Sequence, residues 1–171
     1  AQALIGGLIS RGLPPTRITV SDPVEKVRSL LAEKEVNVTD DNRAAIKNAD
    51  IVVFAVKPQV LAEVLKPLQG LLDGKLVISI VAGAEIATLS ALLGTDRIVR
   101  VMPNTPALVQ TGAHGLFAKD EVKAEDRELA SQVLASTGLT IWVDSEAQID
   151  AVTAVSGSGP AYFFYMMESM I

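Results

Sequence analysis

The feature of this sequence that most limits its fold is a repeated alternation between short runs of β-branched or other apolar residues and longer segments with helical periodicity. Strands are expected at 18–21, 51–56, 76–80, 98–102 and 139–143. Helices are expected between them at 24–35, 59–68, 85–93 and 125–136. Such alternation is typical of βαβ units, in which crossover helices cover a parallel sheet. The sequence therefore predicts an α/β fold with a mostly parallel sheet and helices on both faces.

Glycines mark the ends of three predicted helices, because glycine readily adopts the left-handed conformation found at a helix C-terminus. The helix at 59–68 is expected to end near Gly70, Gly94 to close the helix at 85–93, and Gly138 to close the helix at 125–136. A short apolar run at 115–118 predicts an additional strand at the edge of the sheet.

The pattern changes near residue 150, where strand-like runs stop and helical periodicity continues to the end. The stretch Ser156–Pro160 interrupts it, and its Gly-Pro pair predicts a break followed by a helix with proline in its first turn. That helix carries aromatic or Met side chains on almost every side, so other chain has to cover it. We therefore expect one domain over 1–150 and the start of a helical domain or subunit interface over 151–171.

Both ends of the sequence look like interior parts of a longer chain. Residues 1–5 enter a helical pattern without an initiating Met or a capping Ser, Thr or Asp. The last apolar segment stops without a Gly, a Pro or a basic final turn. We expect the native chain to continue in both directions.

Composition argues against several classes of function. The formal charge of −5 and the lack of Lys/Arg runs argue against nucleic acid as a partner. With no Cys and a single His, the chain offers no disulfide, thiolate metal site or histidine cluster, so no metal is expected. That residue, His114, lacks a partner in motif spacing and is interpreted as structural. The apolar runs are too short to span a bilayer and no signal-peptide pattern is visible, so we expect no membrane partner and a cytoplasmic location.

Ligands of open α/β sheets bind outside the carboxyl ends of the strands, so the loops that follow the predicted strands are candidate sites. Asp22 follows the first strand, where its carboxylate could accept hydrogen bonds from a ribose diol or cap the helix that begins at Pro23. Lys57 lies between a buried strand and Pro58, where its ammonium could bind a cofactor phosphate beside a helix N-terminus or face solvent. Both alternatives stay open at both positions.

Three other loop positions have side chains or backbone suited to a cofactor. Asn42 is expected to cap a helix and could turn its amide toward the same crevice. Ala82 and Gly83 are small enough for a flat ring to approach the backbone. Asn104, held between two prolines, offers a donor and an acceptor to a carboxamide, although a structural turn would look similar.

Three stretches resemble signature segments of the pyrroline-5-carboxylate reductase family, namely Ala-Val-Lys-Pro-Gln at 55–59, Arg-Val-Met-Pro-Asn-Thr-Pro at 100–106 and Asp-Ala-Val-Thr-Ala-Val-Ser-Gly-Ser-Gly-Pro-Ala-Tyr at 150–162. The resemblance covers essentially the whole chain. It implies a Rossmann domain that binds NADP(H) or NAD(H), followed by a helical domain that self-associates as a dimer or higher oligomer and completes the substrate site. Family members begin with a strand and a phosphate loop whose last Ala matches Ala1, and they carry a later Ser-Pro-Gly-Gly-Thr-Thr segment. The loop glycines and that segment are absent from this sequence.

The resemblance also implies a reaction, the NAD(P)H-dependent reduction of 1-pyrroline-5-carboxylate to L-proline in proline biosynthesis. A protonated imine is already electrophilic, so the protein chiefly has to position two rings and exclude water. The residues matching the cofactor site are Asp22, Asn42, Ala55, Lys57, Pro58, Ala82 and Gly83, with Ser21, Val56 and Asn104 beside them. Those matching the region where nicotinamide and substrate meet are Glu146, Thr153 and the Ser156–Pro160 turn, including Ser156 and Ser158.

Two other functions stay open on the sequence alone. A β-hydroxyacid dehydrogenase-like oxidoreductase would use a lysine on the interdomain helix, and 146–171 contains no Lys, Arg or His. A non-catalytic dinucleotide-binding or dimerisation module also stays open, because fold alone does not fix function.

Cofactor preference is open as well, since Asp22 would repel a 2′-phosphate whereas Ser21 with Lys26 or Arg28 would attract one. We therefore expect both cofactors to be accepted.

Overall fold

The computed structural model describes all 171 residues and has an α/β architecture with two sheets. The strands are β1 (Thr19–Ser21), β2 (Asn37–Thr39), β3 (Ile51–Phe54), β4 (Leu76–Ser79), β5 (Ile98–Met102), β6 (Gly112–Phe117) and β7 (Gly138–Trp142). The larger sheet has the order β3-β4-β5-β6-β7. Its β3, β4 and β5 are parallel, β6 is antiparallel to β5, and β7 is parallel to β6. The predicted mostly parallel sheet is confirmed.

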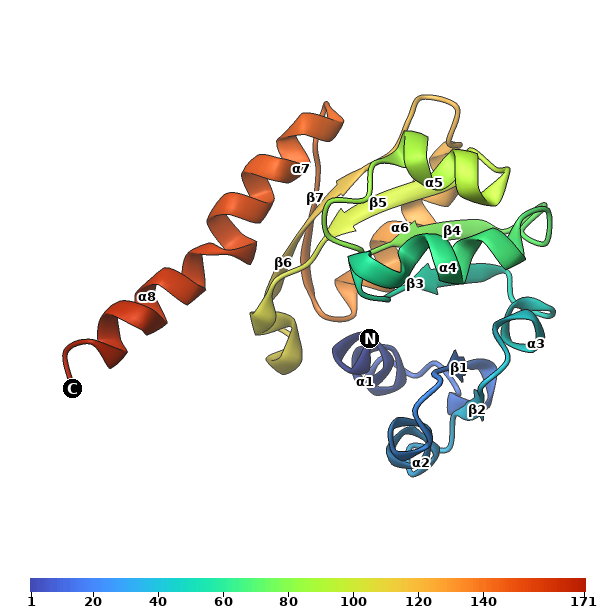
Figure 1. Ribbon diagram of the computed structural model, residues 1–171, viewed down its shortest axis with the longest axis horizontal. Helices are drawn as coiled ribbons and strands as arrows, with labels where there is room; N and C mark the ends of the chain where they lie inside the picture. Colours follow the sequence, from blue (N-terminus) through green and yellow to red (C-terminus); the bar gives the residue numbers. More distant parts are fainter.

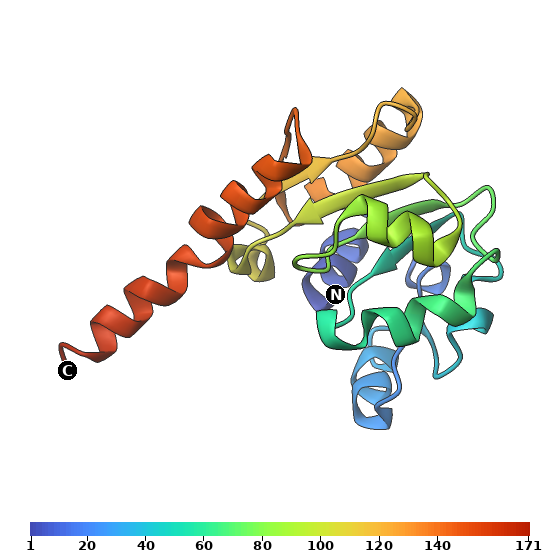
Figure 2. The same cartoon turned by 45° about the horizontal axis from the view of Figure 1, so that its top comes forward.

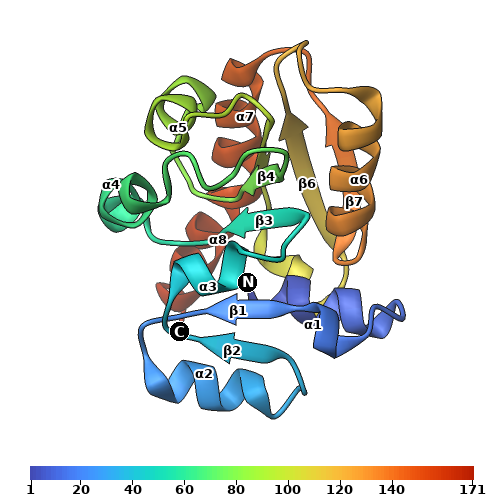
Figure 3. The same cartoon turned by 90° about the vertical axis from the view of Figure 1, so that its right-hand side faces the viewer.

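The smaller sheet consists of β1 and β2, which pair in parallel and form no ladder with β3. Figure 3 shows this pair beside the larger sheet, with β1, β2 and β3 pointing the same way. The sequence did not predict β2, because Asn37–Thr39 has only 3 residues, fewer than the roughly 4–8 over which an alternating pattern indicates a strand.

The helices are α1 (Gln2–Ser10), α2 (Glu25–Ala32), α3 (Asn42–Ile46), α4 (Leu61–Leu65), α5 (Ile86–Leu93), α6 (Ala124–Ala135), α7 (Glu146–Val152) and α8 (Gly159–Glu168). Short 3₁₀ turns occur at Pro15–Arg17, Pro58–Val60, Lys66–Leu68 and Thr105–Val109. Helices cover both faces of the larger sheet (Figure 1), as predicted. One core includes Leu65 of α4 and Leu89 of α5, and the other includes Leu4 of α1 and Leu134 of α6. Strand β4 is buried between them, which explains why three of its four residues, Leu76, Val77 and Ile78, are apolar.

Two predictions for the second half of the sheet are wrong. The run at 115–118 belongs to β6, which lies inside the sheet between β5 and β7 rather than at its edge. Gly138 begins β7 instead of closing α6, whose C-cap is Ser136. Gly138 is needed there for a different reason, because a Cβ on it would overlap the backbone of Gly112 on the neighbouring strand. The prediction for Gly94 is confirmed, since this residue ends α5 with φ 74°.

Beyond β7 the chain forms a helical arm (residues 146–171), distinct from the body (residues 1–143). Helix α7 continues through a π-helical turn, Thr153–Gly157, into α8, and the arm extends away from the body (Figures 1 and 2). The predicted break is therefore wrong, because Ser158 N donates to Thr153 O at 2.7 Å and the helix absorbs the extra residue. Pro160 lies in the first turn of α8, as predicted. None of the helices, α8 included, has the length and apolar character that a bilayer crossing requires.

Candidate functional site

The loop after β1 brings an acidic and a basic side chain to the end of the strand. Asp22 is half-buried, and its Oδ1 accepts a hydrogen bond from Val24 N at 2.8 Å, so the carboxylate binds the backbone at the start of α2. Arg28 Nη1 donates to Asp22 O at 2.7 Å, which places the guanidinium beside the strand end. Of the two nearby cations, Arg28 is bonded to this loop and Lys26 is exposed.

Asn42 is not the cap of its helix. Asp41 is the N-cap of α3, and its Oδ1 accepts from Arg43 N at 2.8 Å, whereas Asn42 is the first helical residue. The correction follows from backbone conformation, because Asp41 has the extended φ and ψ that a cap requires. The Asn42 side chain is half-buried and makes no hydrogen bond within the chain, so its amide is free.

The loop after β3 presents an unpaired cation. Ala55, Lys57 and Pro58 are exposed and Val56 is half-buried. Lys57 forms neither an ion pair nor a side-chain hydrogen bond within the chain. As predicted, a helical segment follows it, which begins as the 3₁₀ turn Pro58–Val60 and continues directly into α4. The unpaired ammonium of Lys57 therefore lies just before the first turn of a helical segment, where an anion could bind.

The loop after β4 exposes its backbone, whereas the loop after β5 uses part of its polar side chain within the protein. Ala82 and Gly83 are exposed, and Gly83 has φ +71° with open space where a Cβ would lie. Asn104 Oδ1 accepts from Ala113 N at 2.9 Å, which ties the loop to β6. The acceptor of Asn104 is thus structural, while its Nδ2 makes no hydrogen bond within the chain.

The start of the arm is held by an ion-pair network that the sequence analysis did not find. Glu146 Oε1 accepts from Arg100 Nη1 at 3.1 Å and from Ile86 N, at the start of α5, at 2.7 Å. Arg100 Nη2 donates to Asp150 Oδ1 at 3.1 Å. The sequence did contain one indication of this network, because Arg100 is the single charged residue in the otherwise apolar strand 98–102 and therefore needs a buried partner. The Glu146 carboxylate occupies the N-terminus of α5, so that helix end is not free for a phosphate.

The hydroxyl groups predicted near the substrate lie on the π-helical turn and beside it. Thr153 Oγ1 donates to Ile149 O at 2.8 Å, and Ser156 Oγ donates to Val152 O at 2.9 Å, whereas Ser158 Oγ makes no hydrogen bond within the chain. A Cβ on Gly157 would lie 3.8 Å from Met102 Sδ. The turn therefore abuts the end of β5, the strand that leads to Asn104.

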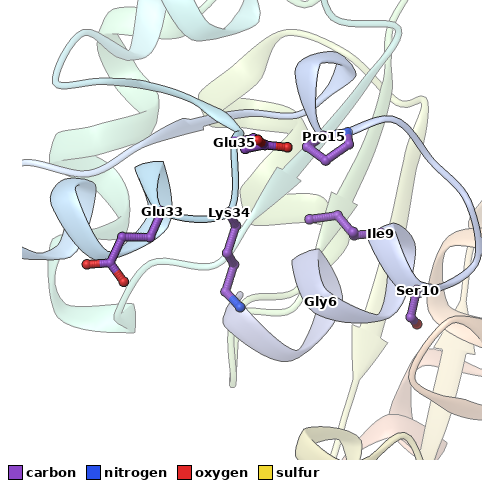
Figure 4. Close-up of a pocket in the computed structure, with 7 residues that line it drawn as sticks. All are labelled: Gly6, Ile9, Ser10, Pro15, Glu33, Lys34 and Glu35. Carbon is purple, nitrogen blue, oxygen red and sulfur yellow. The ribbon is translucent and has the colours of Figure 1, made fainter.

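Two hollows in the surface have a volume suited to a small ligand. One, of about 350 Å³, lies among α1, the turn before β1 and Glu33–Glu35 (Figure 4), and none of the predicted site residues lines it. The other, of about 320 Å³, lies between the strands β6 and β7 and the arm and includes Ser156. None of the predicted cofactor residues lines either hollow.

His114 is buried in β6 and its Nε2 lies 2.9 Å from Thr137 Oγ1. Thr137 Oγ1 donates to Leu134 O, so it accepts from Nε2–H and leaves Nδ1 as an unpaired acceptor. Burial lowers the pKa of His114 below its ordinary value, and this effect exceeds that of a hydrogen bond with the backbone of Thr137, which raises it. The imidazole is thus a neutral structural group at pH 7, in line with its interpretation from the sequence.

Family models match both parts of the chain. Residues 1–83 match the family described as NADP oxidoreductase coenzyme F420-dependent, and residues 146–171 match the family described as pyrroline-5-carboxylate reductase dimerisation. The first match contains the loops after β1, β3 and β4. The second contains the whole arm.

Curated proteins similar to the chain include pyrroline-5-carboxylate reductases from several organisms. The pyrroline-5-carboxylate reductase of Pseudomonas aeruginosa is 49% identical over 99% of this chain and 63% of the relative. That of Haemophilus influenzae is 46% identical over 99% of this chain and 64% of the relative. The chain thus spans slightly less than two thirds of the length of these relatives.

Solved structures extend the similarity to the fold. A pyrroline-5-carboxylate reductase from Coxiella burnetii superposes with a TM-score of 0.91 at 42% identity, covering 98% of this chain and 64% of that one. The pyrroline carboxylate reductase of Plasmodium falciparum, solved with NADP bound, gives a TM-score of 0.85 at 31% identity, with coverage of 98% and 62%. Prephenate dehydrogenase from Aquifex aeolicus, with a TM-score of 0.77 at 18% identity, shares the fold alone.

Proposed function

Because this chain belongs to the pyrroline-5-carboxylate reductase family, we propose that the full-length protein reduces 1-pyrroline-5-carboxylate to L-proline with NADPH or NADH as the last step of proline biosynthesis. The observation that carries this proposal is that the predicted substrate residues adjoin a strand that leads to a predicted cofactor residue. Lys57 and the Asn104 amide have groups without partners in the loops after β3 and β5, and the π-helical turn of the arm abuts the end of β5, the strand that leads to Asn104. A reductase that transfers hydride between two ligands needs such adjacent sites.

The cofactor is proposed to bind the loops after β1, β3, β4 and β5, and the residues there fit such a group. Lys57 has an ammonium without a partner, the backbone at Gly83 faces open space, and Asn104 Nδ2 has free donors. The remaining contacts are assigned to Ser21, Asp22, Asn42, Ala55, Val56, Pro58 and Ala82. When bound, the dinucleotide supplies a hydride from C4 of its nicotinamide.

The substrate is proposed to bind beside the π-helical turn. Ser158 is the hydroxyl there whose proton is free, so it is proposed to donate to the substrate, whereas Thr153 and Ser156 retain lone pairs for accepting hydrogen bonds. Glu146 already binds Arg100 and Ile86 N, so we assign it to holding the arm rather than to proton transfer. No strong base is needed, because a protonated imine accepts hydride directly.

The domain division follows from the same proposal. We assign residues 1–150 to the dinucleotide-binding domain and 151–171 to the start of the helical domain, which is proposed to self-associate with a second copy of the protein. Support comes from the match of residues 146–171 to a dimerisation family and from the exposed side chains of α8. Light scattering on the full-length protein at micromolar concentration tests this, and a strictly monomeric protein would contradict it.

We place the reaction in the cytoplasm, which cell fractionation followed by an activity assay tests.

The assay for the main proposal follows loss of NAD(P)H absorbance when the full-length protein is mixed with 1-pyrroline-5-carboxylate, with L-proline identified as the product. Turnover of β-hydroxy acids instead would favour a β-hydroxyacid dehydrogenase-like enzyme. Cofactor binding without any turnover would favour a non-catalytic module. Either result would reject the proposed reaction.

Lys57→Ala tests the cofactor site separately from turnover. The substitution is expected to weaken cofactor binding by about 1–3 kcal/mol, the range for hydrogen bonds to charged groups. Lys66→Ala is the matched control, because Lys66 is also exposed but lies at the far end of the segment that runs from Pro58 back toward β4. Equal dissociation constants for both variants in calorimetry would remove Lys57 from the site.

A further inference from the structure

Arg100 is a buried cation in the middle of the larger sheet. It is 2% exposed and lies on β5, whose other residues are all apolar. Side chains alternate along a strand, so Arg100 shares a face with Ile98, which packs in the core formed by α4 and α5. A charge in such a place is costly unless carboxylates pair with it.

The partners of Arg100 come from the arm. Its two terminal nitrogens bind Glu146 Oε1 and Asp150 Oδ1, each at 3.1 Å. These acids lie 4 positions apart, on one face of α7. Because Glu146 also accepts from Ile86 N at 2.7 Å, one carboxylate joins β5, α5 and α7. The network therefore connects the body to the arm at the helix that leads into the π-helical turn.

Few other contacts fix the direction of the arm. Ile149 is fully buried, and the side chain of Val152 rests on Gly115, where a Cβ would come within 2.9 Å of it. Farther along, Gly157 lies next to Met102, and every residue of 161–171 is exposed. The contacts that hold the arm to the body thus lie along α7 and the π-helical turn, and Arg100 makes the ion pairs between the two.

We propose that Arg100 is a positioning residue that holds the arm against the sheet and thereby sets the distance between the nicotinamide and the imine carbon. The proposal rests on the function proposed above. The planar guanidinium binds two carboxylates at once through separate nitrogens, which fixes the rotation of α7 as well as its distance from β5. A lysine carries the same charge at a single point and fixes distance alone. Since hydride transfer depends steeply on geometry, a small shift of the arm would slow the reaction without affecting how the body binds cofactor.

The test compares Arg100→Met and Arg100→Lys with the control Arg97→Met in the full-length protein. Arg97 also pairs with a buried carboxylate, but its partner is Asp126 of α6, so the control breaks an ion pair inside the body. Three quantities are measured for each variant: the single-turnover rate of hydride transfer at saturating ligands, the cofactor dissociation constant, and hydrogen exchange of the amides of α7.

Arg100→Met is expected to slow hydride transfer about 10- to 100-fold, while the cofactor dissociation constant changes less than about threefold. The rate of hydride transfer in Arg100→Lys is expected to lie between the rates of Arg100→Met and the wild type. Arg97→Met is expected to lose stability but keep a rate within about threefold of the wild type. Exchange in α7 is expected to accelerate in the Arg100 variants alone. Equal effects of Arg97→Met and Arg100→Met on the rate would overturn the proposal, because Arg100 would then act only on stability.

Asp150→Asn provides a second route if Arg100→Met does not fold. The Asp150 side chain is 73% exposed, and Arg100 keeps its ion pair with Glu146 in this variant, so the protein should still fold, and about a threefold to tenfold slower hydride transfer is expected. An unchanged rate in both Asp150→Asn and Arg100→Lys would overturn the proposal. If the wild type does not reduce the imine at all, the proposed function fails, and the exchange of α7 still decides whether Arg100 holds the arm.

Discussion

The body and the arm use apolar side chains in opposite ways. In the body, Leu65, Leu76 and Leu89 are fully buried between the sheet and its helices. In the arm, the residues from Tyr162 to Met167 are between 45% and 74% exposed. A helix of 10 residues is marginal by itself in water, so α8 needs a covering surface that the body does not provide. Substitutions in the body should therefore report on folding, and substitutions in the arm on association or catalysis.

The largest effect is expected inside the body, at Gly138. Gly138→Ala forces a Cβ into the backbone of Gly112, which cannot move aside without breaking the pairing of β6 and β7, so we expect a loss of about 3–5 kcal/mol in unfolding free energy. Gly74→Ala is the matched control, because Gly74 has φ +70° but no neighbour within 4 Å. That control should cost only about 1–2 kcal/mol for its left-handed backbone. Urea denaturation at one fixed protein concentration measures both, and similar losses would show that the close approach does not matter.

The arm is expected to give the opposite result. Phe163→Glu puts a charge on an exposed aromatic residue, so the unfolding free energy of the body should change by less than about 0.5 kcal/mol, whereas self-association should weaken by about 2 kcal/mol or more. Leu71→Glu adds the same charge to an exposed leucine of the body and should leave association unchanged. Analytical ultracentrifugation separates these outcomes. Equal dissociation constants for Phe163→Glu and the wild type would mean that this face of α8 is not an interface.

The ion pair of Arg97 and Asp126 makes the stability of the body depend on pH, which gives a further test of the difference between body and arm. The hydrogen bond from Arg97 holds the pKa of the Asp126 carboxyl below its ordinary value of 3.8. The folded state therefore binds fewer protons than the unfolded state, so the stability from this pair is present above pH 3.8 and is lost as pH falls through the lower folded pKa. Asp126→Asn should cost about 1–3 kcal/mol at pH 7, less than a fully buried pair because Arg97 is partly exposed.

Chemical denaturation between pH 2 and pH 7 tests this prediction, with Asp120→Asn, an exposed acid of the loop before α6, as the control. The difference in stability between wild type and Asp126→Asn should shrink as the solution becomes more acidic. A difference independent of pH would show that packing, not charge, is lost in the variant.

Cofactor choice is expected to depend on the end of β1. Arg28→Ala should lower the ratio of kcat/KM for NADPH to that for NADH about tenfold, or about 1.4 kcal/mol, because the guanidinium beside Asp22 would no longer face a 2′-phosphate. Asp22→Ser should raise the same ratio if its carboxylate reaches the ribose. Should that substitution change the ratio by less than about twofold, Asp22 serves only to bind Val24 N.

The smallest effect is expected at His114. Burial lowers its pKa below the ordinary 6.5, so the unfolded chain binds a proton that the folded protein does not, and stability should decline as pH falls below 6.5. One proton limits this slope to about 1.4 kcal/mol per pH unit. His114→Gln should flatten the stability curve between pH 5 and pH 7. If the variant keeps the wild-type slope, another group is responsible.

The sequence by itself determined the features that depend on neighbouring residues. The strands at 51–54, 76–79 and 98–102 lie within predicted runs, since a buried parallel strand needs a continuous apolar stretch. Gly94 ends α5 because no other residue adopts its backbone conformation as easily. The family resemblance was also readable from local motifs, and the similarity to solved reductases confirms it.

Only the tertiary structure decided how distant segments share their polar groups. Ile86 and Glu146 are 60 residues apart and Arg100 and Asp150 are 50 apart, yet they form one network. The position of β6 inside the sheet and the bond from Ala113 N to Asn104 likewise depend on chain that packs from elsewhere. Local propensity carries no information about such partners, because a buried charge or an unpaired backbone group is satisfied by whichever segment the fold brings within hydrogen-bonding distance.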